Sequence, residues 1–174
     1  MVKTLFRTYF ILNSGQEVQG LSPVDLETGE VNFLGLDVDL KRKSEEICKK
    51  IFSEIGTQYF LYRTMGGKWR VVEHLSDPMG ADEAKERAKD LEERVEKIGY
   101  KCDTEKTLPQ SYNLKEGKPG AWWFMPYHNE ETHCYSPGGL KLTKSQTEFR
   151  IKYKDHPIVV STIGMIGKGD GGSR

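Results

Sequence analysis

The chain has 174 residues, of which 36% are hydrophobic and 30% are charged, with 26 basic and 26 acidic side chains. This composition is ordinary for a single globular domain, and it excludes a disordered chain and a membrane protein. Because the charges balance, no global field attracts nucleic acid, and any basic surface must be local. The scattered cysteines form no C-x-x-C pair and no signal-peptide pattern is present, so we expect a cytoplasmic protein with reduced thiols.

The first third of the chain predicts two strands followed by a helix. Residues 4–12 are rich in aromatic and β-branched side chains and indicate a buried strand that ends at turn residues 13–15. A second turn at residues 27–30 leads into a strand over residues 31–41. The apolar stripe of residues 44–55 then predicts a helix that ends at a glycine.

The second of these strands contains an unusual pair of acids. Because side chains alternate along a strand, Asp37 and Asp39 share one face. The other face is apolar and is lined by Leu36, Val38 and Leu40. Neighbouring carboxylates repel each other, and a divalent cation such as Mg²⁺ or Mn²⁺ would offset the repulsion. The alternative is a half-exposed strand whose outer face is acidic without a ligand.

Two β-rich runs around a glycine pair predict a hairpin. Its arms are residues 58–64 and 68–75, and residues 65–67 form the turn. Alternation along the second arm places Arg70 and His74 on the same face. Both side chains can therefore line one cleft, although at different ends of it.

The rest of the chain predicts one long helix and several shorter segments. Apolar residues at spacings of three and four predict a helix over residues 82–98 that ends at Gly99. We then expect, in order, an acidic pair leading into a Leu-Pro loop (100–111), an aromatic strand (121–127), a short helix opened by Thr143 or Ser145, and a final apolar segment (157–166). The chain thus predicts a single domain over residues 1–166 and a flexible tail over residues 167–174.

This order of motifs resembles the archaeo-eukaryotic primase superfamily, in particular the primase-polymerases of phages and mobile elements. The resemblance covers residues 5–150, almost the whole chain. Five segments carry it. GLDVDLK at 35–41 resembles the two-aspartate metal motif of the family, RTMGGKWRVV at 63–72 resembles its glycine turn and strand, and residues 77–99 resemble the long helix that follows. EKTLPQ at 105–110 resembles an acidic residue before a hydrophobic-Pro pair, and GAWWFMPY at 120–127 resembles the aromatic segment that ends in Pro-Tyr.

The resemblance implies a fold and an activity. The fold would be an α+β domain with a mostly antiparallel sheet flanked by helices and an RRM-like centre. The activity would be template-directed nucleotidyl transfer, as in a DNA primase or DNA-directed polymerase that replicates a phage or a mobile element in the host cytoplasm. NTP or dNTP and single-stranded or primed DNA would be its substrates, and a helicase or another replication protein would be its partner.

The resemblance also implies a set of site residues. Asp37 and Asp39 would hold the Mg²⁺ or Mn²⁺ ions, with Glu105 as the third acid and Asp103 as its substitute. Cationic side chains and glycine amides would bind the nucleotide. The residues in this second role are Lys68, Arg70, His74, Gly66, Gly67, Asn113 and Lys115.

One position departs from the family pattern. The family usually places a histidine after the glycine turn, and counting from Gly66 puts Arg70 in that place. Arginine keeps the charge and the grip on phosphate but does not donate a proton at ordinary pH. His74 is the equivalent only if a bulge distorts the hairpin. Two alternative functions therefore stay open: a non-catalytic nucleic-acid or nucleotide-binding module, and a metal-dependent phosphoesterase or nuclease.

Overall fold

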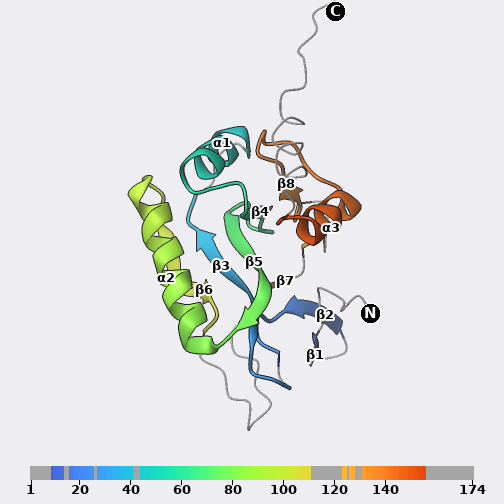
Figure 1. Ribbon diagram of the computed structural model, residues 1–174. Helices are drawn as coiled ribbons and strands as arrows, with labels where there is room; N and C mark the ends of the chain where they lie inside the picture. The colour runs from blue at the N-terminus through green and yellow to red at the C-terminus, as the bar shows by residue number, and fades with distance from the viewer. Residues whose placement is uncertain are drawn as a thin grey trace, which may run out of the picture.

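A computed structural model describes residues 9–13, 16–25, 27–40, 44–110, 123–124, 126–127 and 131–155. These residues form an α+β fold with two antiparallel sheets and three helices (Figure 1). The strands are β1 (Tyr9–Asn13), β2 (Gln16–Leu21), β3 (Val31–Val38), β4 (Phe60–Arg63), β5 (Trp69–Met79), β6 (Cys102–Leu108), β7 (Trp123–Phe124) and β8 (Cys134–Tyr135). The helices are α1 (Ser44–Glu54), α2 (Ala81–Lys97) and α3 (Lys144–Lys152).

The larger sheet has five strands in the order β6-β3-β5-β4-β8, and all neighbouring strands are antiparallel. Strands β1, β2 and β7 form a second, three-stranded sheet. The predicted antiparallel sheet flanked by helices is thus confirmed.

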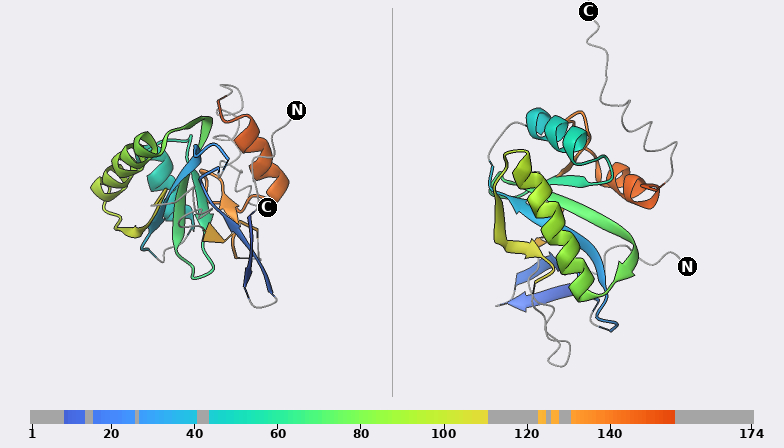
Figure 2. Two further views of the ribbon diagram at one scale, coloured as in Figure 1. Left: turned by 90° about the horizontal axis from the view of Figure 1, so that it is seen from below. Right: turned by 60° about the vertical axis from the view of Figure 1, so that its left-hand side comes forward.

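The two faces of the five-stranded sheet are covered by different helices. Helices α1 and α2 lie on one side of the sheet and α3 lies on the other (left panel of Figure 2). On the side of α1 and α2, Leu36, Val38 and Trp69 are buried in an apolar core with residues of both helices. On the opposite side, Phe33 and Val72 belong to a second core that includes a residue of α3. The central strands β3 and β5 therefore contribute side chains to a core on each side of the sheet.

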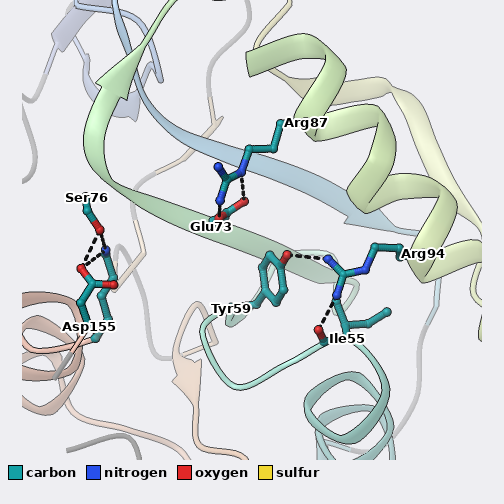
Figure 3. A network of polar contacts seen from close by, with 8 residues as sticks. Ile55, Tyr59, Glu73, Ser76, Arg87, Arg94 and Asp155 are labelled. Carbon is teal, nitrogen blue, oxygen red and sulfur yellow. Dashed lines mark hydrogen bonds and ion pairs between the residues drawn. The ribbon is translucent and has the colours of Figure 1, made fainter. Parts of the chain in front are cut away.

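Two arginines attach α2 to the sheet and to the turn before β4 (Figure 3). Arg87 forms a two-pronged ion pair with the buried Glu73 of β5. Arg94 donates hydrogen bonds to the Tyr59 hydroxyl at 2.9 Å and to the Ile55 carbonyl at 2.5 Å. The charged side of α2 therefore helps to hold its apolar side, which includes Leu91 and Val95, against the core.

Local sequence signals predicted the helices closely. The predicted helices over residues 44–55 and 82–98 correspond to α1 and α2, and Gly99 has the positive φ of 92° expected of a C-terminal glycine. Thr143 opens α3, because its hydroxyl accepts a hydrogen bond from the Gln146 amide in a capping box. None of the helices in the described ranges is long and apolar enough to cross a membrane.

Several strands differ from the prediction. Residues 102–108 form β6 although the sequence indicated a loop, and β2 was not predicted. The segment from Asp77 was expected to begin the long helix, but Asp77 and Pro78 belong to the end of β5. The expected strand over residues 31–41 ends at Val38. The apolar segment 157–166 and the tail 167–174 lie outside the described residues.

Candidate functional site

Strand β3 places Asp37 on the face opposite Leu36 and Val38, as the alternation predicted. Leu36 and Val38 are fully buried in the core beneath α1 and α2, and Asp37 points to the opposite face, where it is 5% exposed. Asp39 follows directly after β3, and its side chain is half-exposed. An ionised carboxylate as buried as Asp37 needs a charged or hydrogen-bonded partner, because leaving it alone in a low dielectric is costly.

Arg70 is the partner of Asp37. The two residues lie directly opposite each other in the pairing of β3 with β5, and Arg70 Nε donates to Asp37 Oδ1 at 2.6 Å. The Arg70 guanidinium also lies 4.4 Å from the centre of the Trp123 ring, a cation–π distance. Arg70 is therefore held between a carboxylate and an aromatic ring.

Gly35 makes room for Trp123 beside this ion pair. A Cβ atom built at Gly35 would lie 2.0 Å from a ring carbon of Trp123. The indole therefore lies against the backbone of β3 at Gly35, which is two positions before Asp37 in the chain. The contact was not predicted from the sequence, although a glycine inside a strand is a known sign of close approach by another group.

The register of β6 determines which acid accompanies Asp37. Asp103 lies directly opposite Asp37, and directly opposite residues of antiparallel strands share a face. The register then shifts before the pair Gly35 and Leu108, so that residues 104–107 stand against a single residue of β3. Glu105 lies in this irregular stretch and is exposed, and its carbonyl accepts a hydrogen bond from the Gln110 amide. Of the two acids considered for the third position, Asp103 is the neighbour of Asp37.

The other two acids, Asp39 and Asp103, also have cationic partners. Lys68 Nζ lies 2.6 Å from Asp39 Oδ1, and Lys106 Nζ lies 2.8 Å from Asp103 Oδ2. The hydrogen bond from Lys68 lowers the pKa of the Asp39 carboxyl, and the hydrogen bond to Asp103 raises the pKa of the Lys106 ammonium. With Asp37 and Arg70, these residues form three acid–cation pairs at one end of the sheet. We call them the charged corner.

The predicted glycine turn lies between β4 and β5. Gly67 has a φ of 75°, a conformation that glycine adopts without strain, and its amide donates to the Thr64 carbonyl at 2.9 Å. A Cβ atom at Gly66 would meet no other atom within 4 Å. Lys68 follows the turn and leads into Arg70, so the turn presents two cations at the charged corner.

A cavity of about 340 Å³ lies beside the charged corner, on the face of the sheet opposite α1 and α2. Its wall contains four cations and one carboxylate, together with aromatic and apolar side chains. The main lining residues are Phe33, Asp37, Tyr62, Arg63, Gly66, Lys68, Arg70, Val72, His74, Lys106 and Trp123. The cavity thus combines an excess of positive charge with an aromatic surface.

Arg70 and His74 both line this cavity, as the alternation along β5 predicted. They have different electrostatic roles. His74 is buried, shares a hydrogen bond of 3.2 Å with the Tyr62 hydroxyl, and packs edge-on against Phe60. Burial, with the positive charges of Lys154 and Arg150, lowers the pKa of His74 to about 3. His74 is therefore neutral at pH 7, and Arg70 supplies positive charge.

The hairpin has no bulge between its glycine turn and Arg70. β4 and β5 pair without a shift from Phe60 and Val72 to Arg63 and Trp69. No bulge therefore separates the glycine turn from Arg70, and Arg70 stands next to the acidic strand. His74 lies opposite Phe33, four residues farther along β5.

Asn113 and Lys115 lie outside the described residues. Within the described ranges, no group of three or more His, Cys, Asp and Glu side chains is placed to hold a metal ion. The carboxylates of the charged corner are nevertheless the hard oxygen donors that Mg²⁺ and Mn²⁺ prefer. The chemistry of these oxygens suits such an ion, whereas in the structure Lys68, Arg70 and Lys106 are already paired with Asp39, Asp37 and Asp103.

The sequence was also compared with known proteins. No protein-family model matches the chain, and no curated protein matches it.

Proposed function

We propose that this chain is the catalytic module of a primase or primase-polymerase, with an RRM-like core and template-directed nucleotidyl transfer as its activity. The observation that supports the proposal most strongly is the charged corner. There, Asp37 and Asp103 lie opposite each other on neighbouring strands, and Asp39 follows directly after β3. A glycine turn and a cationic cavity lie beside them. Nucleotidyl transfer requires carboxylates beside a triphosphate-binding surface, and this corner provides both kinds of group.

The acids would hold Mg²⁺ or Mn²⁺. We assign this role to Asp37, Asp39 and Asp103, with Glu105 as the alternative third acid. When bound, the ions would activate the primer hydroxyl and stabilise the departing pyrophosphate. Arg70 orients Asp37 through its hydrogen bond, because the guanidinium is itself fixed by Trp123.

The hairpin and the cavity would bind the nucleotide, either NTP or dNTP. Lys68 and Lys106 provide mobile positive charge for the phosphates, and the amides of Gly66 and Gly67 can donate to phosphate oxygens. The neutral His74 can offer a hydrogen bond but no charge. Single-stranded or primed DNA would be the template, and a replication protein such as a helicase would be the partner.

Primer extension tests the proposal. The protein is incubated with Mn²⁺, dNTP and a labelled primed template, beside the variants Asp37→Asn and Glu45→Gln. Glu45 is an exposed acid of α1 paired with Lys49, so its variant controls for the loss of one negative charge. We expect extension by the wild type and by Glu45→Gln, and a decrease on the order of 100-fold for Asp37→Asn. Degradation of the primer without extension would instead support a phosphoesterase.

A non-catalytic nucleotide-binding module is the second candidate. The observation that favours it is the buried ion pair between Asp37 and Arg70, which already satisfies one oxygen of the central acid. Arginine in the place of the usual histidine also removes a proton donor. Nucleotide binding by the wild type without any extension or degradation would favour this candidate.

A further inference from the structure

The three ion pairs of the charged corner differ in how firmly they are held. The pair of Asp37 with Arg70 is nearly buried, with side chains 7% and 16% exposed, and Trp123 covers the guanidinium. The pairs made by Lys68 and Lys106 lie at the surface. Exposed lysine–carboxylate pairs contribute little to stability, because water screens them and two flexible side chains must be ordered. The lysines can therefore leave their acids easily, whereas Arg70 cannot.

The side chains of Lys68 and Lys106 can also turn toward the cavity. Lys68 and Lys106 both line the cavity, whereas Asp39 and Asp103, their partners, are not part of its wall. Each ammonium group thus lies on a flexible four-carbon stem between a carboxylate and a cavity that already has an excess of positive charge. Rotation of the side chain alone can transfer it from one to the other.

We infer that Lys68 and Lys106 are exchangeable counter-ions: they neutralise Asp39 and Asp103 in the free protein, and they turn to the phosphates when a triphosphate enters the cavity. The carboxylates that they leave are then open to a divalent cation. This inference deepens the proposed function and rests on it for the identity of the two ligands. Metal and triphosphate would then be taken up together.

The exchange has a consequence that can be measured for each ligand alone. In the free protein the lysines compete with a metal ion for the acids, and the acids compete with an anion for the lysines. Removing the lysines should therefore strengthen metal binding, and removing the acids should strengthen triphosphate binding. If the pairs do not compete with either ligand, neither affinity should change.

The first experiment measures Mn²⁺ binding in the absence of nucleotide, from the electron paramagnetic resonance signal of free Mn²⁺. Lys68→Met and Lys106→Met are each expected to bind Mn²⁺ about threefold more tightly than the wild type, and the double variant about tenfold. Lys49→Met is the matched control, because Lys49 forms an exposed pair with Glu45 at the same distance of 2.6 Å as Lys68 with Asp39. The control removes the same charge and should leave the affinity unchanged.

The second experiment measures the binding of inorganic tripolyphosphate by calorimetry in EDTA, so that no metal takes part. The double variant Asp39→Asn/Asp103→Asn is expected to bind tripolyphosphate about tenfold more tightly than the wild type. Glu45→Gln is the control for the loss of an acid elsewhere on the surface. Circular dichroism melts of every variant exclude unfolding as the cause of a change.

The inference is overturned if the lysine variants bind Mn²⁺ no better than the wild type, or if the aspartate variants bind tripolyphosphate no better. It is also overturned if the α1 controls reproduce the gains, since net charge would then explain them, or if no variant binds Mn²⁺. If the protein extends primers but the variants bind Mn²⁺ and tripolyphosphate no more tightly, the proposed activity stands and only the exchange is refuted. If the variants bind more tightly but the protein does not extend primers, the activity is refuted and the exchange stands.

Discussion

The two faces of the five-stranded sheet are built from alternate residues of the same strands, yet they differ in chemistry. On the face toward α1 and α2, β3 and β5 present Leu36, Val38 and Trp69, all fully buried. On the opposite face, at the end near the glycine turn, the intervening residues Asp37 and Arg70 form an ion pair beside a cavity. One face stabilises the domain through apolar burial, and this frees the other face to carry charge at a local cost in stability.

The largest effect should come from weakening the apolar face. Leu36→Ala removes a fully buried side chain beneath the helices and should lower the free energy of unfolding by about 3 kcal/mol. Urea denaturation followed by circular dichroism measures this. A change below about 1 kcal/mol would mean that the helix-covered face is not the main source of stability.

Acid should destabilise the protein through the opposite face. The pKa of His74 is about 3 in the folded protein and about 6.5 in the unfolded chain, so unfolding takes up a proton between these pH values. The contribution of His74 to stability is complete above pH 6.5 and is lost as the pH falls toward 3. At pH 5 we expect a loss of roughly 2 kcal/mol relative to pH 7.5.

The His74→Phe variant tests this assignment. It has no group that titrates at this position, so its unfolding free energy should fall less between pH 7.5 and pH 5 than that of the wild type. Urea denaturation at both pH values provides the comparison. An equal fall in both proteins would show that other groups cause the acid sensitivity.

A single methyl group at Gly35 should disturb the packing of Trp123 beside the ion pair of Asp37 and Arg70. Gly35→Ala places a Cβ atom where the Trp123 ring lies, so either the ring or the strand must move. We expect a loss of about 1.5 kcal/mol, in the range of overpacked cores, with a change in tryptophan fluorescence. An unchanged emission spectrum together with wild-type stability would show that Trp123 does not lie against Gly35.

The smallest effect concerns the coupling within the charged corner. A double-mutant cycle with Asp37→Asn and Arg70→Met should give a coupling free energy of roughly 1 kcal/mol, because the pair is shielded and hydrogen-bonded. The same cycle on Asp39 and Lys68, an exposed pair, should give a clearly smaller value. Equal coupling in the two cycles would remove the distinction between a fixed inner pair and exchangeable outer pairs.

Local patterns in the sequence predicted the helices and the hairpin because these elements depend on residues close in the chain. The spacing of apolar residues in α2, the glycines after the helices and the turn before Lys68 are all short-range signals. Strand β6 was missed for a related reason. Its sequence, CDTEKTL, is mostly polar because it is an edge strand with an exposed middle, so it carries no apolar alternation.

The sequence by itself placed Asp37 on the side of its strand opposite Leu36 and Val38, and it placed Arg70 and His74 on one side of the hairpin, because alternation along a strand is a local property. Only the tertiary structure decided that Arg70 and Asp103, and not His74 and Glu105, lie directly beside Asp37. Those neighbours depend on the register between strands that are far apart in the chain. A shift such as the one at residues 104–107 of β6 leaves no mark on the local pattern, yet it changes which carboxylate stands next to the acidic strand.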